Sequence, residues 1–597
     1  MNSKATYSSM MSVCVAALAS VCTQAALAQG NPDARAPVTD ELTKRPNVLL
    51  LVGDDMGLGE LSPFGSEINT PALSLLADKG TRFSNFHVSP VCSVTRSQLL
   101  TGANSIEVGL GAFDYSVYPK ARGKPGYEGY LTRNTTTLAE ILYGAGYNTY
   151  HVGKWHLGGT HGGHGPHEWG FQHTYGVFPG GSGHWNAEDM VFNLAAPESK
   201  AAISRGEVAP KTNTQFYEDG QPVDRPQGIY SDDLYVGKMI NFIDEGKVSG
   251  RPFFGYVAFT TAHFPIQAPS ALIGKYVETY RELGYEGVKK LRYERMKEMG
   301  VYPSTAPLPP ENPITLKWKE LSEEEREIRT RLFATFAAMV ESQDYHIGRL
   351  MDYLRETGQL DNTLVIYMTD NGPEGADAFG PLGNKTWTDW IEANYSMAVE
   401  DIGTSASSRQ IGKEWANAAT GALQWWKWFV GEGGIRVPLI IVPPKDHAVP
   451  QPGGLSDTVV SVKDISATVL DYTGVKHPGQ KFLGRDLVQP SGISMVPYLS
   501  GNKDQVRDQK DWFAFELFGN SFVIQGDYKA IFVRPGMYGD GRWHLYNITA
   551  DPGETTPLDD KEAARLESMT KLYEAYAKKH AIVPVDPDWN AFTEAGH

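Results

Sequence analysis

The chain has 597 residues, of which 41% are hydrophobic and 21% are charged. This composition is typical of a globular protein that is large enough for an extensive core and more than one domain. The formal net charge of -16 argues against a nucleic acid partner, but it does not exclude a small anionic substrate held by a local cluster of cations.

The N-terminus, residues 1–28, has the features of a secretory signal peptide. Lys4 supplies a positive charge, Met10–Ala19 is a short apolar stretch, and Ala26-Leu27-Ala28 is a small-residue cleavage site. Residues 29–44 are polar and are predicted to form a linker. We therefore expect a protein that is secreted across the inner membrane into the periplasm or the extracellular space. No later segment has the apolar length that stable membrane insertion requires.

Apolar runs alternate with helical patterns over residues 45–505. The runs predicted to be buried strands are Asn47–Val52, Asn148–Val152, Phe253–Phe259 and Thr363–Met368. Predicted helices span Thr70–Gly80, the segment from Thr137 to Gly146 and Ser322–Gly358, the last two opened by capping boxes. This alternation predicts an α/β fold, with a large, mostly parallel central sheet sandwiched by helices.

Residues 506–597 have a different pattern and are predicted to form a C-terminal α+β subdomain. Short strands separated by turns are expected at Trp512–Leu517, Phe522–Ile524, Tyr528–Val533 and Trp543–Tyr546. A helical pattern, Lys561–His580, follows them. The expected structure is a small antiparallel sheet with one helix.

Polar side chains follow each of the predicted parallel strands. These residues are Asp54 and Asp55, then Lys154 and His156, then His263, and finally Asp370 and Asn371. Any one of these groups alone would more often belong to an ordinary turn or be a structural histidine. Because the carboxyl ends of parallel strands meet at one edge of a sheet, we expect all of them to converge there.

The carboxylate and amide groups in this set predict a metal site. Asp54, Asp55, Asp370 and Asn371 offer hard oxygen ligands only. Such a set favours Ca²⁺, with Mg²⁺ as the second choice, over Zn²⁺.

Cys92 is the only cysteine outside the predicted signal peptide, so it has no partner for an intramolecular disulfide. Alone, it would more often be a small buried residue. However, Arg96 follows four residues later, and the run to Gly102 is typical of a helix that ends at glycine. The helix N-terminus would suit a nucleophile that handles an anion. Together with Lys427, otherwise a solvated surface lysine, these groups predict hydrolysis of an anionic ester, a sulfate or a phosphate.

The motifs identify a known family when they are taken in order. They are Pro46-Asn47 to Gly57, Cys92-Ser93-Val94-Thr95-Arg96, Gly123 to Gly129, Gly153-Lys154-Trp155-His156-Leu157-Gly158, Thr369-Asp370-Asn371-Gly372 and Gly433-Gly434-Ile435-Arg436-Val437-Pro438. From about Arg45 to the C-terminal helix, the chain resembles the type I sulfatases of the alkaline phosphatase superfamily, and among them the bacterial arylsulfatases.

This resemblance implies a mechanism and a set of residue roles. Cys92 is expected to be oxidised by a maturation enzyme to Cα-formylglycine, whose hydrate attacks the sulfur of a small aryl sulfate ester. The resemblance further implies Ca²⁺ on the four oxygen ligands, Arg96 and Lys154 holding the hydrate, and His156 acting as a base. His263 is expected to protonate the leaving group, and Lys427 to hold the sulfate.

One position departs from the family pattern. The usual recognition core of the maturation enzyme is Cys-x-Pro-x-Arg, and here Val94 replaces the proline. Conversion of Cys92 is therefore expected to be slower or incomplete. Two alternatives stay open: a phosphonate or phosphate ester hydrolase of the same superfamily, and a catalytically silent binding protein if Cys92 is not converted.

Overall fold

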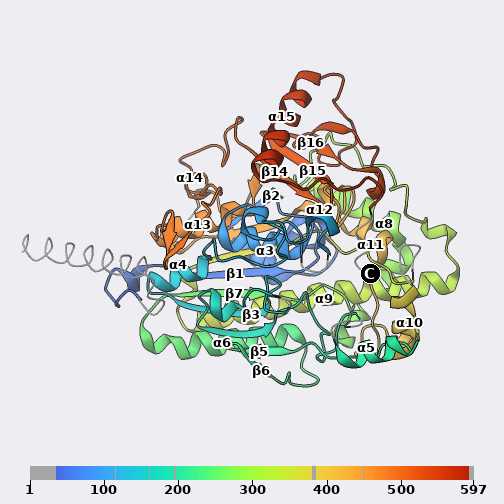
Figure 1. Ribbon diagram of the computed structural model, residues 1–597, viewed down its shortest axis with the longest axis horizontal. Coiled ribbons are helices and arrows are strands. Elements are labelled where there is room, and N and C mark those ends of the chain that lie inside the picture. Colours follow the sequence, from blue (N-terminus) through green and yellow to red (C-terminus); the bar gives the residue numbers. More distant parts are fainter. Residues whose placement is uncertain are drawn as a thin grey trace, which may run out of the picture.

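The structure, a computed structural model, describes residues 35–589 except 114–115, 161, 192, 194–195, 380–384 and 448 (Figure 1). The predicted signal peptide and the first residues of the predicted linker lie outside the described residues. In the part of the chain that is described, we find no helix with both the length and the apolar character needed to span a bilayer.

An eleven-stranded sheet forms the centre of the molecule. In spatial order its strands are β10 (Gly454–Ser456), β2 (Thr81–His87), β9 (Arg436–Val442), β8 (Thr363–Thr369), β1 (Asn47–Gly53), β7 (Phe253–Ala258), β3 (Asn148–Lys154), β4 (His173–Val177), β5 (Phe216–Glu218) and β6 (Gln221–Val223), with β11 (Val460–Ser461) also paired to β2. The predicted strands are β8, β1, β7 and β3, which are adjacent and parallel. The sequence patterns did not reveal β9, which is antiparallel to both of its neighbours, or the antiparallel edge strands β5 and β6.

Strand β1 is buried on both faces, which explains its continuous apolar sequence. Val48, Leu50 and Val52 join one hydrophobic cluster, which includes residues of α3 (Cys92–Thr101), α4 (Leu138–Gly144) and α13 (Lys463–Thr473). Leu49 and Leu51 join a second cluster with α2 (Pro71–Lys79), α6 (Ser231–Gly246) and α9 (Glu323–Glu356). Figure 1 shows α6 and α9 on one side of the strands and α3 and α4 on the other. The predicted α/β sandwich is therefore confirmed.

The two predicted capping boxes are confirmed by their hydrogen bonds. Thr137 accepts from the backbone N–H of Glu140 at the start of α4, and Ser322 accepts from the backbone N–H of Glu325 at the start of α9. Other α-helices in the described part of the chain are α5 (Pro197–Ser204), α7 (Ser270–Ile273), α8 (Val277–Glu298), α10 (Lys385–Asn394), α11 (Gly412–Ala419), α12 (Glu432–Ile435) and α14 (Val496–Leu499). The strands β12 (Lys481–Phe482) and β13 (Arg485–Asp486) pair in an antiparallel arrangement and form a separate two-stranded sheet.

The C-terminal part forms the expected antiparallel sheet with one helix. Its strands are β14 (Trp512–Leu517), β15 (Asn520–Gln525), β16 (Tyr528–Phe532) and β17 (Trp543–Asn547), paired in that order, and α15 (Ala563–Lys579) follows them. Lys529 of β16 is fully buried, and its Nζ contacts the carboxylate of Glu432 at 2.8 Å and the carbonyl of Val430 at 2.7 Å. This contact attaches the small sheet to the segment that follows Lys427.

Candidate active site

The site lies at the carboxyl ends of the central parallel strands. Strand β1 leads directly into Asp54 and Asp55, β8 into Asp370 and Asn371, and β3 ends at Lys154. Because Gly53 is in register with Thr369, the acidic residues that follow these two strands begin side by side. All the predicted site residues meet in one cluster of buried or half-buried side chains.

Hydrogen bonds link three of the four predicted oxygen ligands. The backbone N–H of Asp55 donates to Oδ1 of Asp370 at 3.3 Å, and Nδ2 of Asn371 donates to Oδ1 of Asp55 at 2.7 Å. Asp55 has a φ of +60°, a left-handed conformation that is uncommon outside glycine and often occurs at functional sites. Asp54 precedes Asp55 and has a carboxylate oxygen within 4.8 Å of one of Asp370. The adjacent ends of β1 and β8 therefore bring the four residues together.

The donor set fits a hard cation. Among the described residues, no hydrogen-bond donor reaches the buried Oδ1 atoms of Asp54 and Asn371. Burial and the neighbouring Asp370 carboxylate raise the pKa of Asp54 well above its ordinary value. A divalent cation among these oxygens would supply the missing partner and stabilise the ionised carboxylates. Ligand atoms of Asp54 and Asp370 lie within 4.8 Å of each other and of the Cys92 thiol.

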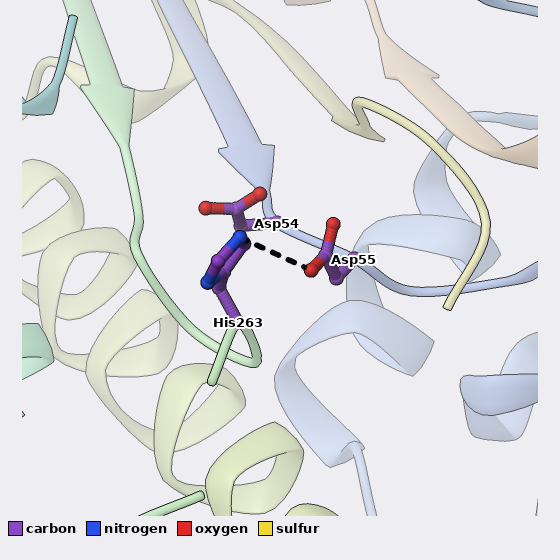
Figure 2. A group of neighbouring side chains, drawn as sticks. All are labelled: Asp54, Asp55 and His263. Atoms are coloured by element: carbon purple, nitrogen blue, oxygen red, sulfur yellow. Dashed lines mark ion pairs between the residues drawn. The ribbon is translucent and has the colours of Figure 1, made fainter. Parts of the chain in front are cut away.

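His263 lies beside these carboxylates, on the segment after β7. Figure 2 shows its ring next to Asp54 and Asp55, which leave the end of β1, and its Nε2 is 3.5 Å from Oδ2 of Asp55. Nδ1 is 2.8 Å from the backbone carbonyl of Phe264, which fixes the orientation of the ring. Burial, together with the nearby ammonium groups of Lys427 and Lys154, lowers the pKa of His263 well below its ordinary value. The imidazole is therefore neutral before an anion binds.

Cys92 is the first residue of α3, at the positive end of the helix. Its Sγ is 3.2 Å from Nδ1 of His156, and only 4% of the residue is exposed. His156 also has a left-handed backbone conformation, with a φ of +56°. The predicted nucleophilic position therefore has a potential base within hydrogen-bonding distance.

Arg96 and Lys154 are paired with carboxylates of the acidic cluster. Arg96, one turn after Cys92, donates through Nε and Nη2 to Oδ2 of Asp370 at 2.9 and 2.7 Å. Nζ of Lys154 contacts Oδ2 of Asp54 at 2.7 Å. Both cations are fully buried, so each depends on its carboxylate for charge compensation.

Lys427 enters the site from a loop far from these elements in sequence. Its Nζ is 2.8 Å from Oδ1 of Asp55 and 3.0 Å from Oε2 of Glu374. Burial opposes the charge of this ammonium group, but Asp55 and Glu374 outweigh it and raise the pKa of Lys427 well above its ordinary value. The sequence patterns did not single out Glu374. The available signal was its position in Asn371-Gly372-Pro373-Glu374, on the same loop as a predicted ligand.

Comparison with known proteins shows the family of this chain. The sequence profile described as Sulfatase matches residues 46–475. The chain belongs to the sulfatase family. It is 36% identical to an uncharacterized sulfatase of Schizosaccharomyces pombe over 92% of this chain and 96% of that protein. It is also 32% identical to an arylsulfatase of Klebsiella aerogenes, over 76% of this chain and 91% of that protein.

Solved structures share the fold of this sulfatase. Ps i-CgsB, in complex with k-i-k-neocarrahexaose, superimposes with a TM-score of 0.59 at 23% identity and covers 89% of this chain and 93% of its own. The phosphonate monoester hydrolase of Agrobacterium radiobacter superimposes with a TM-score of 0.52 at 17% identity, covering 90% and 96%. The family and the named relatives establish this sulfatase as a sulfuric ester hydrolase.

Proposed function

We propose that this sulfatase hydrolyses aryl sulfate esters to a phenol and sulfate, using Cα-formylglycine formed from Cys92 and a Ca²⁺ ion. The observation that carries the proposal is the position of Cys92 at the start of α3, with ligand atoms of Asp54 and Asp370 within 4.8 Å. The relative named arylsulfatase, which covers three quarters of this chain, supports the aryl leaving group.

The Ca²⁺ ion and the formylglycine of this proposal would each supply one kind of chemistry at the site. Asp54, Asp55, Asp370 and Asn371 would hold Ca²⁺, with Mg²⁺ as the second choice, and the ion would polarise the sulfate oxygens. Hydrated formylglycine would supply one hydroxyl to attack sulfur and a second hydroxyl whose deprotonation expels sulfate, so that water need not attack the sulfate ester.

The chain's own residues position the substrate and move the protons. The Lys427 ammonium group would bind a sulfate oxygen, while Arg96 and Lys154 hold the nucleophilic residue between them. His156, with Nδ1 3.2 Å from the side chain of residue 92, is placed to take a proton from it.

His263 is proposed to donate a proton to the phenolate leaving group. Its Nδ1 points at the Phe264 carbonyl, so Nε2 is the nitrogen available to the substrate. Because the free imidazole is neutral, this role requires the negative charge of the bound sulfate ester to favour its protonated form. The negative charge of Asp55, whose Oδ2 is 3.5 Å from Nε2, would also stabilise the imidazolium.

Two measurements test the proposal. Purified protein from the native host should hydrolyse 4-nitrophenyl sulfate faster than 4-nitrophenyl phosphate or a phosphonate monoester. A mass spectrum of the Cys92 peptide should show the lower mass of an aldehyde, and the peptide should react with hydrazides. Faster turnover of the phosphorus esters would favour the phosphonate or phosphate hydrolase. A peptide found wholly as cysteine in an active preparation would overturn the formylglycine proposal.

Val94→Pro is expected to raise the fraction of Cys92 that is converted in a heterologous host. Proline favours an extended segment before it and restores the usual recognition core of the maturation enzyme. Residue 94 is the third residue of α3, where backbone N–H groups have no acceptor within the helix, so proline should disturb the folded site little. Conversion is measured by mass spectrometry and activity is divided by it.

Measuring both quantities separates an effect of Val94→Pro on the conversion of Cys92 from an effect on the folded site. We expect total activity to rise while turnover per converted site stays the same. Unchanged conversion would show that the maturation enzyme tolerates valine. A collapse of activity per converted site would instead reveal a structural role for Val94, whose side chain is fully buried.

We further propose that the protein is exported and acts in the periplasm or outside the cell. The predicted signal peptide supports this, and N-terminal sequencing of the protein purified from its host tests it. Cleavage after Ala28 is expected, and an intact N-terminus on the mature protein would contradict export by this route.

A further inference from the structure

Glu374 is a buried carboxylate at the edge of the candidate site. Its Oε2 is 3.0 Å from Nζ of Lys427, and each of its carboxylate oxygens is 3.2 Å from Nε1 of Trp428, which donates to them. The backbone N–H of Ala376 donates to Oε1 at 2.9 Å. Only 6% of Glu374 is exposed. These donors surround a carboxylate that is shielded from solvent.

Metal binding does not require this carboxylate, and Glu374 is the second of two acidic partners of Lys427. Lys427 already has an acidic partner, because its Nζ is 2.8 Å from Oδ1 of Asp55. The groups of candidate metal ligands among the described residues contain Asp54, Asp55 and His263, or Asp54, Cys92 and Asp370, and neither group includes Glu374. In a site that binds an anion, an additional negative charge weakens binding. The cost rises with the charge of the anion, so such a group discriminates between anions.

A charge count shows which anion the site matches. The count is made before an anion binds, with His263 neutral and the carboxylates ionised. It includes three cations and four carboxylates, all buried: Arg96, Lys154, Lys427, Asp54, Asp55, Asp370 and Glu374. With the divalent ion of the proposed function, the sum is one positive charge. With a neutral residue at position 374, the sum would be two positive charges. A sulfate monoester carries one negative charge, whereas a phosphate monoester carries nearly two above pH 7.

We propose that Glu374 is a specificity-determining residue that lowers the positive charge of the site by one and so selects sulfate monoesters against dianionic phosphate monoesters. This inference rests on the proposed function of the same site. The charge acts over a short distance in a buried environment, where salt screens it little.

The kinetic test compares three substrates at pH 8: 4-nitrophenyl sulfate, 4-nitrophenyl phosphate and bis(4-nitrophenyl) phosphate. The third contains phosphorus but carries one negative charge, so it separates charge from the identity of the central atom. Glu374→Gln and Glu374→Ala should each raise kcat/KM for the phosphate monoester relative to both monoanions by about tenfold. Glu374→Asp, which keeps the charge, should leave these ratios near those of the wild type.

An equilibrium test avoids turnover altogether. Sulfate and sulfamate are both tetrahedral sulfur oxyanions, but sulfate carries two negative charges at pH 8 and sulfamate carries one. Isothermal titration calorimetry with each anion should show that Glu374→Gln tightens sulfate relative to sulfamate by about tenfold. Glu374→Asp should not change this ratio.

The outcomes distinguish selection from mere positioning. If all three substrates and both anions weaken in parallel in Glu374→Gln and Glu374→Ala, Glu374 only positions Lys427 and Trp428, and the proposal is wrong. A phosphate monoester rate that does not rise relative to the monoanions, including one that stays below detection, also overturns it. A wild-type protein without sulfatase turnover would count against the proposed function instead, and the calorimetric comparison would still decide the role of Glu374.

Discussion

Cys92→Ala is expected to lower kcat/KM for 4-nitrophenyl sulfate by at least about 10⁴-fold, a loss typical of removing a catalytic nucleophile. Alanine cannot be converted to formylglycine, and it offers no hydroxyl for attack on sulfur. The proposed metal ligands and Lys427 stay in place, so the substrate should still bind. Steady-state kinetics measures the loss of turnover, and calorimetry with inorganic sulfate measures the retained affinity.

Ser93→Ala is the matched control for this prediction. Ser93 is the next residue of α3 and is fully buried, and no described residue accepts a hydrogen bond from its Oγ. The substitution should leave turnover per converted site close to that of the wild type. Residual activity of Cys92→Ala within tenfold of the wild type would show that Cys92 is not the nucleophilic position.

Asp370→Ala is expected to lower the bound metal content and to reduce turnover by more than about 100-fold. Asp370 is a predicted cation ligand and also accepts two hydrogen bonds from Arg96, at 2.9 and 2.7 Å. Its loss therefore removes a predicted ligand and the two short carboxylate contacts of a buried guanidinium, which keeps only the longer contact to Asp54 at 4.0 Å among the ion pairs of the described residues. Metal content is measured by elemental analysis. Added Ca²⁺ should raise the Tm of the wild type but not that of the variant.

Asp344→Asn is the control for the loss of a buried acidic group. Asp344 lies on α9 and accepts the backbone N–H groups of Ala72 and Leu73 of α2, and among the described residues it has no hydrogen bond or ion pair with the predicted site residues. This variant should keep the metal and the Ca²⁺-dependent rise in Tm. Chelation should abolish turnover in both the wild type and this control. Stoichiometric Zn²⁺ that is essential for activity would show that the oxygen ligand set has been misinterpreted.

Local patterns in the sequence were sufficient to predict the central strands and the residues at their ends. The continuous apolar run in β1 reflects burial on both faces, and capping boxes at Thr137 and Ser322 mark helix starts through hydrogen bonds between residues three apart. These signals depend on neighbours in the chain, so they are visible without the fold. The order of motifs identified the family for the same reason.

The antiparallel strand β9 shows where local patterns were insufficient. Arg436–Val442 lies between β2 and β8, whose nearest residues are far from it in sequence. The antiparallel direction of β9 depends on its pairing with β2 and β8 and on the path of the loop that precedes it. The apolar sequence of the segment specifies neither the pairing nor the loop path, and it would fit a parallel strand equally well.

The sequence by itself determined which side chains of this sulfatase are candidates for chemistry, because Cys92, Asp54 and Asp370 occur at recognisable strand and helix ends. Only the tertiary structure decided their partners. It paired Lys154 with Asp54, and it placed Lys427 between Asp55 and Glu374. The physical reason is that a buried charge must find an opposite charge in space, and loops that are distant in sequence supply it. The net charge of the site therefore depends on the tertiary structure, which brings these charged side chains together.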